Sequence, residues 1–104
     1  MSLNIILIEK SLVKKEKVSV LNCEGINQET LDYGKIIVKY AFQKYDNNLE
    51  RSKFIAESFE KIFSTEKNWF CFMFKENYGG CYYFMKDYQI VYKYDGYKIL
   101  LFQH

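Results

Sequence analysis

The sequence contains no proline, one histidine, only three cysteines and no apolar run long enough to span a membrane. The histidine is His104, the last residue, where chains are usually mobile, so a Cys–His catalytic pair is not indicated. Cys23, Cys71 and Cys81 lack the paired spacing of zinc ligands and cannot all pair in one chain. We therefore expect free thiols in a reducing compartment and a non-catalytic protein without metal or cofactor.

The composition is that of one globular domain. The chain has 104 residues, of which 49% are hydrophobic and 19% aromatic, and its net charge of +2 is too small to indicate nucleic acid or an anionic membrane as partner. The N-terminal apolar segment lacks the basic start and cleavage site of a secretory signal. Residues 1–16 are interpreted as an N-terminal extension and residues 17–104 as the domain.

The first half of the domain predicts one strand followed by two helices. Residues 18–21 alternate as a strand does. Asn27 is expected to cap the first helix, with Ile26 and Leu31 as a hydrophobic staple. Asn48 is expected to cap the second. The apolar positions recur at helical spacing, namely Leu31, Val38, Ala41, Phe42 and Tyr45 in the first helix and Ile55, Phe59, Ile62 and Phe63 in the second.

The last third predicts four short aromatic strands, at 69–74, 78–84, 89–94 and 97–102. Asp95 and Gly96 form a two-residue hairpin signal, because both residues tolerate positive φ. Gly79 and Gly80 stand inside a strand, where glycine often marks the close approach of another backbone. The predicted fold is therefore α+β: one strand, two helices, then a four-stranded antiparallel meander.

This ordered set of residues resembles dynein light chain type 1. The matching residues, in chain order, are Lys44, Tyr45, Phe59, Phe63, Trp69, Cys71, Asn77, Tyr78, Gly79, Ile99, Leu100, Leu101 and Phe102. The resemblance covers about four-fifths of the chain. It implies a two-fold dimer in which each subunit donates the strand 78–84 to the sheet of the other. It also implies that an extended partner segment adds to the open sheet edge by β-augmentation.

The resemblance also implies the partners and the site. The partners would be segments of dynein intermediate or heavy chains, with other extended peptides possible, in the cytoplasm and cytoskeleton; cytoplasmic and axonemal dynein both stay open. By position, the expected groove residues are Asn48, Leu49, Asn77, Tyr78, Gly79, Gly80, Cys81, Tyr82, Tyr83, Phe84, Val91 and Lys93. The expected dimer-interface residues are Trp69, Phe70, Tyr78, Gly79 and Cys81.

Several of these positions depart from the family. Asn48 and Leu49 stand where the family has an acidic residue and a lysine that grip the partner's glutamine. Tyr83 and Phe84 replace a threonine and a histidine of the groove. The backbone mode of binding is expected to survive, whereas the side-chain specificity is expected to change. Phe70 replaces an interface histidine, so we expect no dissociation of the dimer at low pH.

Binding of single-stranded nucleic acid is the alternative from another class. Aromatic side chains on a sheet can stack on bases, and Lys75, Lys86, Lys93 and Lys98 could contact phosphates. The simpler interpretation makes the aromatic residues core and interface, and the lysines a solvated face. The small net charge favours that interpretation.

Overall fold

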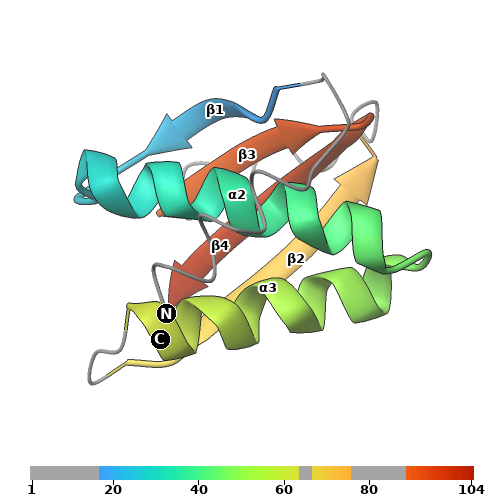
Figure 1. Ribbon diagram of the computed structural model, residues 1–104. Helices are drawn as coiled ribbons and strands as arrows, with labels where there is room; N and C mark the ends of the chain where they lie inside the picture. The colour runs from blue at the N-terminus through green and yellow to red at the C-terminus, as the bar shows by residue number, and fades with distance from the viewer. Residues whose placement is uncertain (1–16, 64–66, 76–88) are drawn as a thin grey trace.

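The structure, a computed structural model, describes residues 17–63, 67–75 and 89–104 as two helices packed on one side of an antiparallel sheet (Figure 1). The elements, in chain order, are β1 (Ser19–Cys23), α2 (Gln28–Lys44), α3 (Asn48–Ile62), β2 (Trp69–Lys75), β3 (Ile90–Tyr94) and β4 (Tyr97–Gln103). The α+β class and the order of one strand, two helices and then antiparallel strands are confirmed. The predicted strand 78–84 and the extension 1–16 lie outside the described residues.

The sheet has the strand order β1-β3-β4-β2. The hairpin between β3 and β4 is confirmed, with Asp95 at φ 51° and Gly96 at φ 80° as the two turn residues. The pairing of β2 differs from that of a simple meander, because β2 lies along β4, with Phe70 opposite Phe102. Among the described strands, β1 and β2 therefore form the two edges.

Helix α2 begins as expected. The side chain of Asn27 accepts a hydrogen bond from the backbone N–H of Thr30 at 2.8 Å, which satisfies one of the unpaired amides of the first turn. Leu31 is buried, and Ile26 packs against the same core. Of the predicted apolar face, Leu31, Val38, Ala41 and Phe42 are buried, whereas Tyr45 is the C-cap of the helix and is only half-buried.

Helix α3 is capped by Asn47, so the prediction of Asn48 as the cap is wrong. Asn47 is extended, and its Oδ1 accepts a hydrogen bond from the N–H of Glu50 at 2.9 Å. Asn48 is the first helical residue, and its Oδ1 accepts instead from Nη1 of Arg51 at 3.0 Å. Adjacent asparagines are equally good caps by type, so the point at which the backbone turns helical decides between them.

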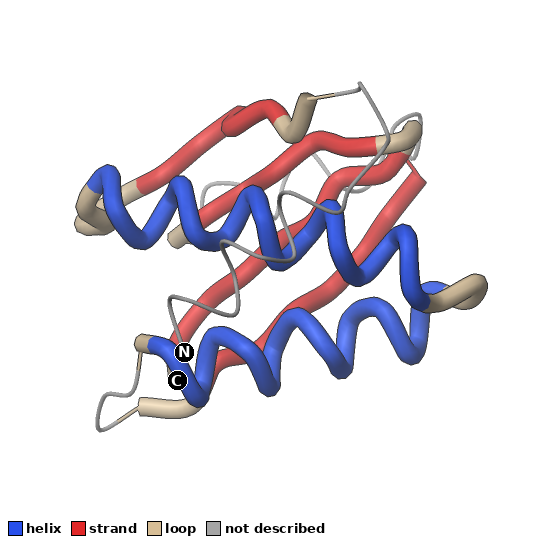
Figure 2. Tube along the Cα trace, viewed as in Figure 1, coloured by secondary structure: helices blue, strands red, loops and turns tan. Residues whose placement is uncertain are grey.

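The core lies between the helices and the sheet. Helix α2 packs on β3 and helix α3 on β2, an arrangement that the tube view makes plain (Figure 2). Every second residue of β3 faces the helices, and Ile90, Tyr92 and Tyr94 are at most 1% exposed. Ile55 and Phe59 of α3 are fully buried in the same core.

Three hydrogen bonds connect the helices to the sheet. The hydroxyl of Tyr92 donates a hydrogen bond to the backbone carbonyl of Leu31 at 2.8 Å, beside Gly34. In the edge strand β2, the N–H of Trp69 donates to Oε1 of Glu60 at 2.6 Å, and Nε1 of Trp69 donates to the carbonyl of Phe63 at 3.2 Å. These contacts fix β3 under α2 and β2 under α3.

Candidate functional site

The predicted groove residues fall into three groups. Residues 77–84 lie outside the described residues. Asn48 and Leu49 begin α3, and Leu49 is 82% exposed. Val91 and Lys93 lie on the face of β3 that points away from the helices, since their neighbours Ile90, Tyr92 and Tyr94 face the helices. Within one subunit, the structure therefore does not bring the start of α3 together with Val91 and Lys93.

The two described residues of the predicted dimer interface point in opposite directions. The side chain of Trp69 packs on Phe59 of α3, with ring centroids 4.9 Å apart, and Trp69 is only 5% exposed. Phe70 lies on the other face of β2 and is 39% exposed. Of the two, only Phe70 has substantial side-chain surface available to a partner.

The sheet face that points away from the helices is apolar. We call it the outer face, and it comprises Phe70, Phe72, Phe74, Val91, Leu100 and Phe102. Val91 and Leu100 are fully buried and pack with Phe74, whereas Phe72 is 47% exposed. A sheet in which both faces carry apolar side chains requires cover on both faces.

Three rings of the outer face form a continuous stack. The ring of Phe102 lies 5.1 Å from that of Phe70 at an interplanar angle of 20°, and 6.0 Å from that of Phe72 at 9°. This arrangement follows from the register, because Phe102 is directly opposite Phe70 and diagonal to Phe72. The stack presents a flat aromatic surface next to a sheet edge.

The sequence analysis did not predict that four residues, Phe72, Phe74, Leu100 and Phe102, lie together on one face of the sheet. The available signal was β2 itself, in which all six residues from Trp69 to Phe74 are apolar. A strand that covers one core and meets water on its other face alternates apolar and polar residues. An unbroken apolar strand indicates burial on both faces.

Basic side chains share the outer face with these rings. Lys93 of β3 is directly opposite Lys98 of β4, and both residues are half-buried. Lys75, at the end of β2, is exposed but belongs to the alternation that faces the helices. Two of the lysines considered for phosphate contacts therefore lie on the same sheet face as the aromatic stack, and Lys86 lies outside the described residues.

The register separates two of the cysteines considered as zinc ligands. Cys23 is opposite Ile90, Ile90 is opposite Leu101, and Leu101 is opposite Cys71. Three strand spacings separate the two cysteines, about 14 Å, which is too far for one metal ion. In the part of the chain that the structure describes, no group of three or more His, Cys, Asp or Glu side chains could hold a metal.

The structure also places Cys71 and His104, the residue types that a Cys–His catalytic pair would need. Burial raises the pKa of the Cys71 thiol to about 12, although a hydrogen bond with Ser52 lowers it, so this cysteine is a weak nucleophile. The backbone of His104 forms two hydrogen bonds with Asn68, of 2.9 and 3.1 Å, and the residue is exposed.

Two comparisons with known proteins find no match for this sequence. No protein-family model matches the sequence, and a search of the curated proteins finds no relative. Among residues 17–63, 67–75 and 89–104, neither helix is sufficiently long and apolar to cross a membrane.

Proposed function

We propose that this protein is a non-catalytic, dimeric light chain of the dynein type, which binds extended segments of dynein intermediate or heavy chains by β-augmentation. The observation that carries the proposal is the stacked aromatic surface of Phe70, Phe72 and Phe102 beside the edge strand β2. The element order, with one strand before two helices and the remaining strands after them, also agrees with the dynein light chain resemblance.

The outer face supports a dimer on physical grounds. Phe70 and Phe72 are 39% and 47% exposed, although each is a large apolar side chain in a regular strand. A contiguous exposed aromatic patch favours association, because burial of apolar surface stabilises a complex by about 25 cal/mol per Å² before the costs of association. A second copy of the chain would bring an identical face to it, in the isologous manner of two-fold dimers.

The edge of β2 supports the exchange of a strand. Along one side β2 pairs with β4, and no described strand lies along its other side. Such an edge is a template for a further strand. In the proposed dimer, the strand 78–84 of the second subunit would add there, and an extended partner segment would add in turn to that strand.

The first experiment measures the mass of the full chain in solution and titrates the chain with a peptide that contains Thr-Gln-Thr. A dimer that binds one peptide per subunit is expected if the groove accepts the family's motif. A dimer that binds segments of dynein chains but not this peptide would support the fold and altered specificity. A monomer at micromolar concentration would contradict the proposal.

A variant of the outer face sharpens the test. Phe72→Lys is expected to weaken dimerisation by roughly 30-fold or more, since buried aromatic residues at interface centres contribute about 2 kcal/mol or more. Leu21→Lys is the matched control, because Leu21 is an exposed apolar residue of β1, the opposite edge strand of the sheet. Equal effects of the two variants would argue against the outer face as the interface.

Binding of single-stranded nucleic acid is a second candidate, favoured by one observation. Lys93 and Lys98 lie on the same sheet face as the stacked rings of Phe70 and Phe72. Bases could stack on these rings while the lysines contact phosphates. Affinity for an oligonucleotide that falls steeply with salt, and that is lost with Phe72→Lys, would support this candidate over the dimer.

A further inference from the structure

A group of three aromatic side chains lies in the helix layer, away from the sheet. Phe54 of α3 packs between Tyr40 of α2 and Tyr45, the residue that ends α2. Its ring centroid is 5.3 Å from that of Tyr40 and 5.6 Å from that of Tyr45, with interplanar angles of 47° and 50°. All three residues are half-buried, and of the three Phe54 also packs against the core.

This aromatic group already holds an ammonium ion of its own chain. Nζ of Lys44 lies 5.6 Å from the ring centroid of Tyr40, 5.3 Å from that of Tyr45 and 5.8 Å from that of Phe54. Each distance is within the range over which a cation is attracted to the face of an aromatic ring. A hydrogen bond with the Tyr45 side chain is the main cause of a raised Lys44 pKa, so Lys44 stays charged at neutral pH. Three rings that converge on one cation form an aromatic cage.

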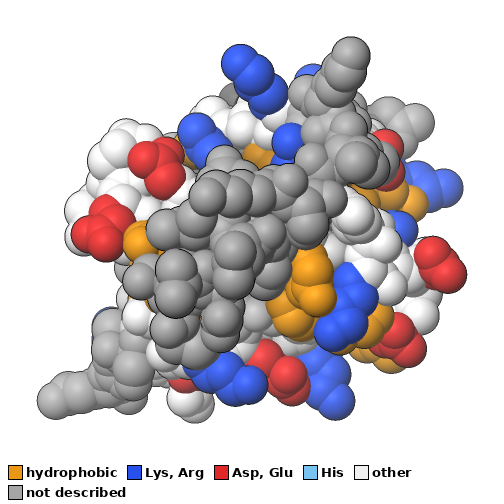
Figure 3. All heavy atoms as spheres, viewed as in Figure 1, with side chains coloured by type: hydrophobic (Ala, Val, Ile, Leu, Met, Phe, Trp, Pro, Cys, Tyr) orange, Lys and Arg blue, Asp and Glu red, His pale blue; other side chains and the backbone are white. Residues whose placement is uncertain are grey.

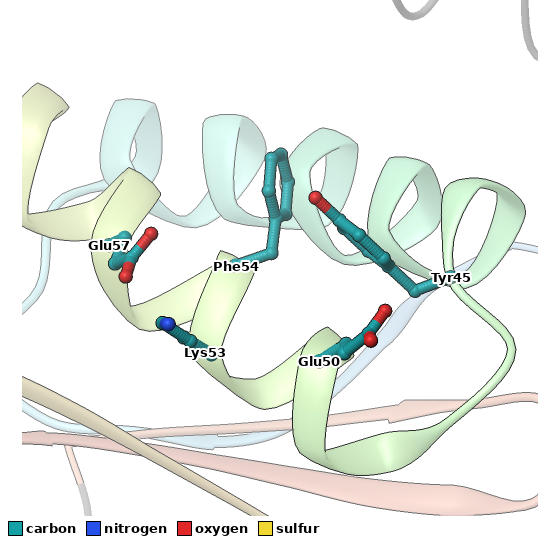
Figure 4. Close-up of a pocket in the computed structure, with 5 residues that line it drawn as sticks. All are labelled: Tyr45, Glu50, Lys53, Phe54 and Glu57. Carbon is teal, nitrogen blue, oxygen red and sulfur yellow. The ribbon is translucent and has the colours of Figure 1, made fainter.

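A pocket adjoins two of the three rings. Its volume is about 350 Å³, and it is lined by Tyr45, Glu50, Lys53, Phe54 and Glu57 (Figure 4). The four residues from α3 have the spacing i, i+3, i+4 and i+7, which places them on one face of the helix. Tyr45 reaches from the end of α2 toward Phe54, with Glu50 close to its ring in the close-up. In the space-filling view, hydrophobic side chains are visible between charged ones over this part of the helix layer (Figure 3).

The lining of the pocket carries two carboxylates, of Glu50 and Glu57, and one ammonium, of Lys53. Glu50 and Glu57 are exposed, and within the part of the chain that the structure describes neither carboxylate forms a salt bridge with Lys53. The two carboxylates outnumber the single ammonium of Lys53 in the lining, so an organic cation would meet net attraction from the charges and from the negative faces of two rings, whereas an anion would meet net repulsion. The pocket volume suits an alkyl chain with a charged head, and aromatic cages of this kind recognise substituted ammonium groups.

We propose that this pocket binds the alkylammonium group of a lysine side chain on a partner protein, with Tyr45 and Phe54 facing its methylene groups and Glu50 and Glu57 facing its charge. Lys44 is the resident competitor, because its ammonium uses two of the same rings. The site is on the helix layer, apart from the proposed dimer face on the sheet, and it adjoins the predicted groove residues Asn48 and Leu49, which directly precede Glu50.

The test is an NMR titration of the full chain, uniformly labelled with ¹⁵N, with three small probes. These probes are Nα-acetyl-lysine methylamide, its Nε-trimethyl derivative and the neutral norleucine analogue. Both charged probes are expected to shift the amide signals of Tyr45, Glu50, Phe54 and Glu57, and norleucine is expected to leave them unchanged. A stronger response to the trimethyl derivative would identify methylated lysine as the preferred partner group. Equal shifts with norleucine, or shifts located elsewhere, would overturn the proposal.

Charge variants provide the matched controls. Lys44→Gln is expected to tighten binding of the charged probes by roughly threefold, because it removes the competing cation. Lys61→Gln removes the same charge from the last turn of α3 and is expected to have a much smaller effect. Glu50→Gln combined with Glu57→Gln is expected to weaken binding roughly threefold or more without loss of the fold, since both residues are exposed. Unchanged affinity in the double variant would contradict the site.

Discussion

The hydroxyl of Tyr92 lies directly against Gly34, in the place that a side chain at position 34 would occupy. Tyr92 is fully buried, and its hydroxyl donates to the backbone carbonyl of Leu31 one turn earlier in α2. Burial raises the pKa of this hydroxyl above its ordinary value, so it stays protonated and able to donate. The absence of a side chain at Gly34 therefore allows the strand and the helix to approach closely.

Gly34→Ala is expected to destabilise the fold by about 1–3 kcal/mol, although alanine is the better helix former by about 1 kcal/mol. The added Cβ would overlap the Tyr92 hydroxyl and lie 2.8 Å from the ring of Phe59. Denaturant unfolding would measure the loss. The penalty is expected to be smaller in a Tyr92→Phe background, which lacks the hydroxyl. A gain in stability from Gly34→Ala alone would show that this approach is not tight.

The capping of α3 predicts unequal effects at two adjacent asparagines. Asn47→Ala is expected to lower the free energy of unfolding by about 1 kcal/mol, because the N–H of Glu50 loses its partner. Asn48→Ala is expected to have a smaller effect, since it removes only the part-buried contact with Arg51. Thermal or denaturant unfolding of the two variants compares them directly, and a larger loss at Asn48 would reverse the assignment of the cap.

The raised pKa of Cys71 and the exposure of Cys23 predict that a thiol reagent modifies the two cysteines at different rates. At pH 8, iodoacetamide is expected to modify the exposed Cys23 and to leave Cys71 unmodified in the folded protein. Peptide mass spectrometry would locate the label. Rapid modification of Cys71 at a rate independent of denaturant would contradict burial of its thiol.

The raised pKa of the Cys71 thiol predicts that the folded protein loses stability at alkaline pH. Its pKa rises from 9.0 to about 12 on folding, so between these values the unfolded chain releases a proton that the folded chain retains. The stabilising contribution is complete below pH 9 and decreases by about 1.4 kcal/mol per pH unit above it. The free energy of unfolding of the native chain is therefore expected to fall faster from pH 9 to 11 than that of Cys71→Ala, so that the difference between the two values becomes smaller. A constant difference would argue against the raised pKa.

The proposed dimer is expected to persist in mild acid. Phe70 has no titratable group, and the only histidine of the chain, His104, is exposed. Sedimentation at about pH 5 and about pH 7 is expected to give the same mass, and Phe70→His is expected to introduce dissociation at the lower pH. Dissociation of the native dimer at pH 5 would show that another group controls the interface.

The sequence was sufficient to predict the elements whose signals are local. Asn27 caps the backbone N–H of Thr30, three residues later, and Asp95 and Gly96 adopt the positive φ of a tight turn. Because both signals involve only residues close in sequence, the start of α2 and the β3–β4 hairpin were predictable. The position of β2 beside β4 depends on contacts between segments distant in sequence, which periodicity does not reveal. Gly34 interrupts a helical pattern and could have indicated a close approach, but the partner Tyr92 could not be named.

The candidate sites were predictable only in part. The aromatic residues of β2 were recognised, but assigning Trp69 to one face and Phe70 to the other required the observed packing. The cage of Tyr40, Tyr45 and Phe54 combines residues from two helices, and its geometry depends on how these helices cross. No spacing within one segment could have indicated it.

The two-residue turn between β3 and β4 has a consequence for the order in which the chain folds. Hairpins with such short connections form in about 1–10 μs, well before contacts between distant segments. Once formed, this hairpin would present Tyr92 and Ile99 side by side as an apolar surface against which α2 can pack. We therefore expect Gly96→Ala, which strains a residue at φ 80°, to slow folding more than it speeds unfolding. Stopped-flow measurement of both rates is the test. A reduced folding rate in the variant would place the hairpin in the folding nucleus, whereas a change in the unfolding rate alone would mean that the hairpin forms late.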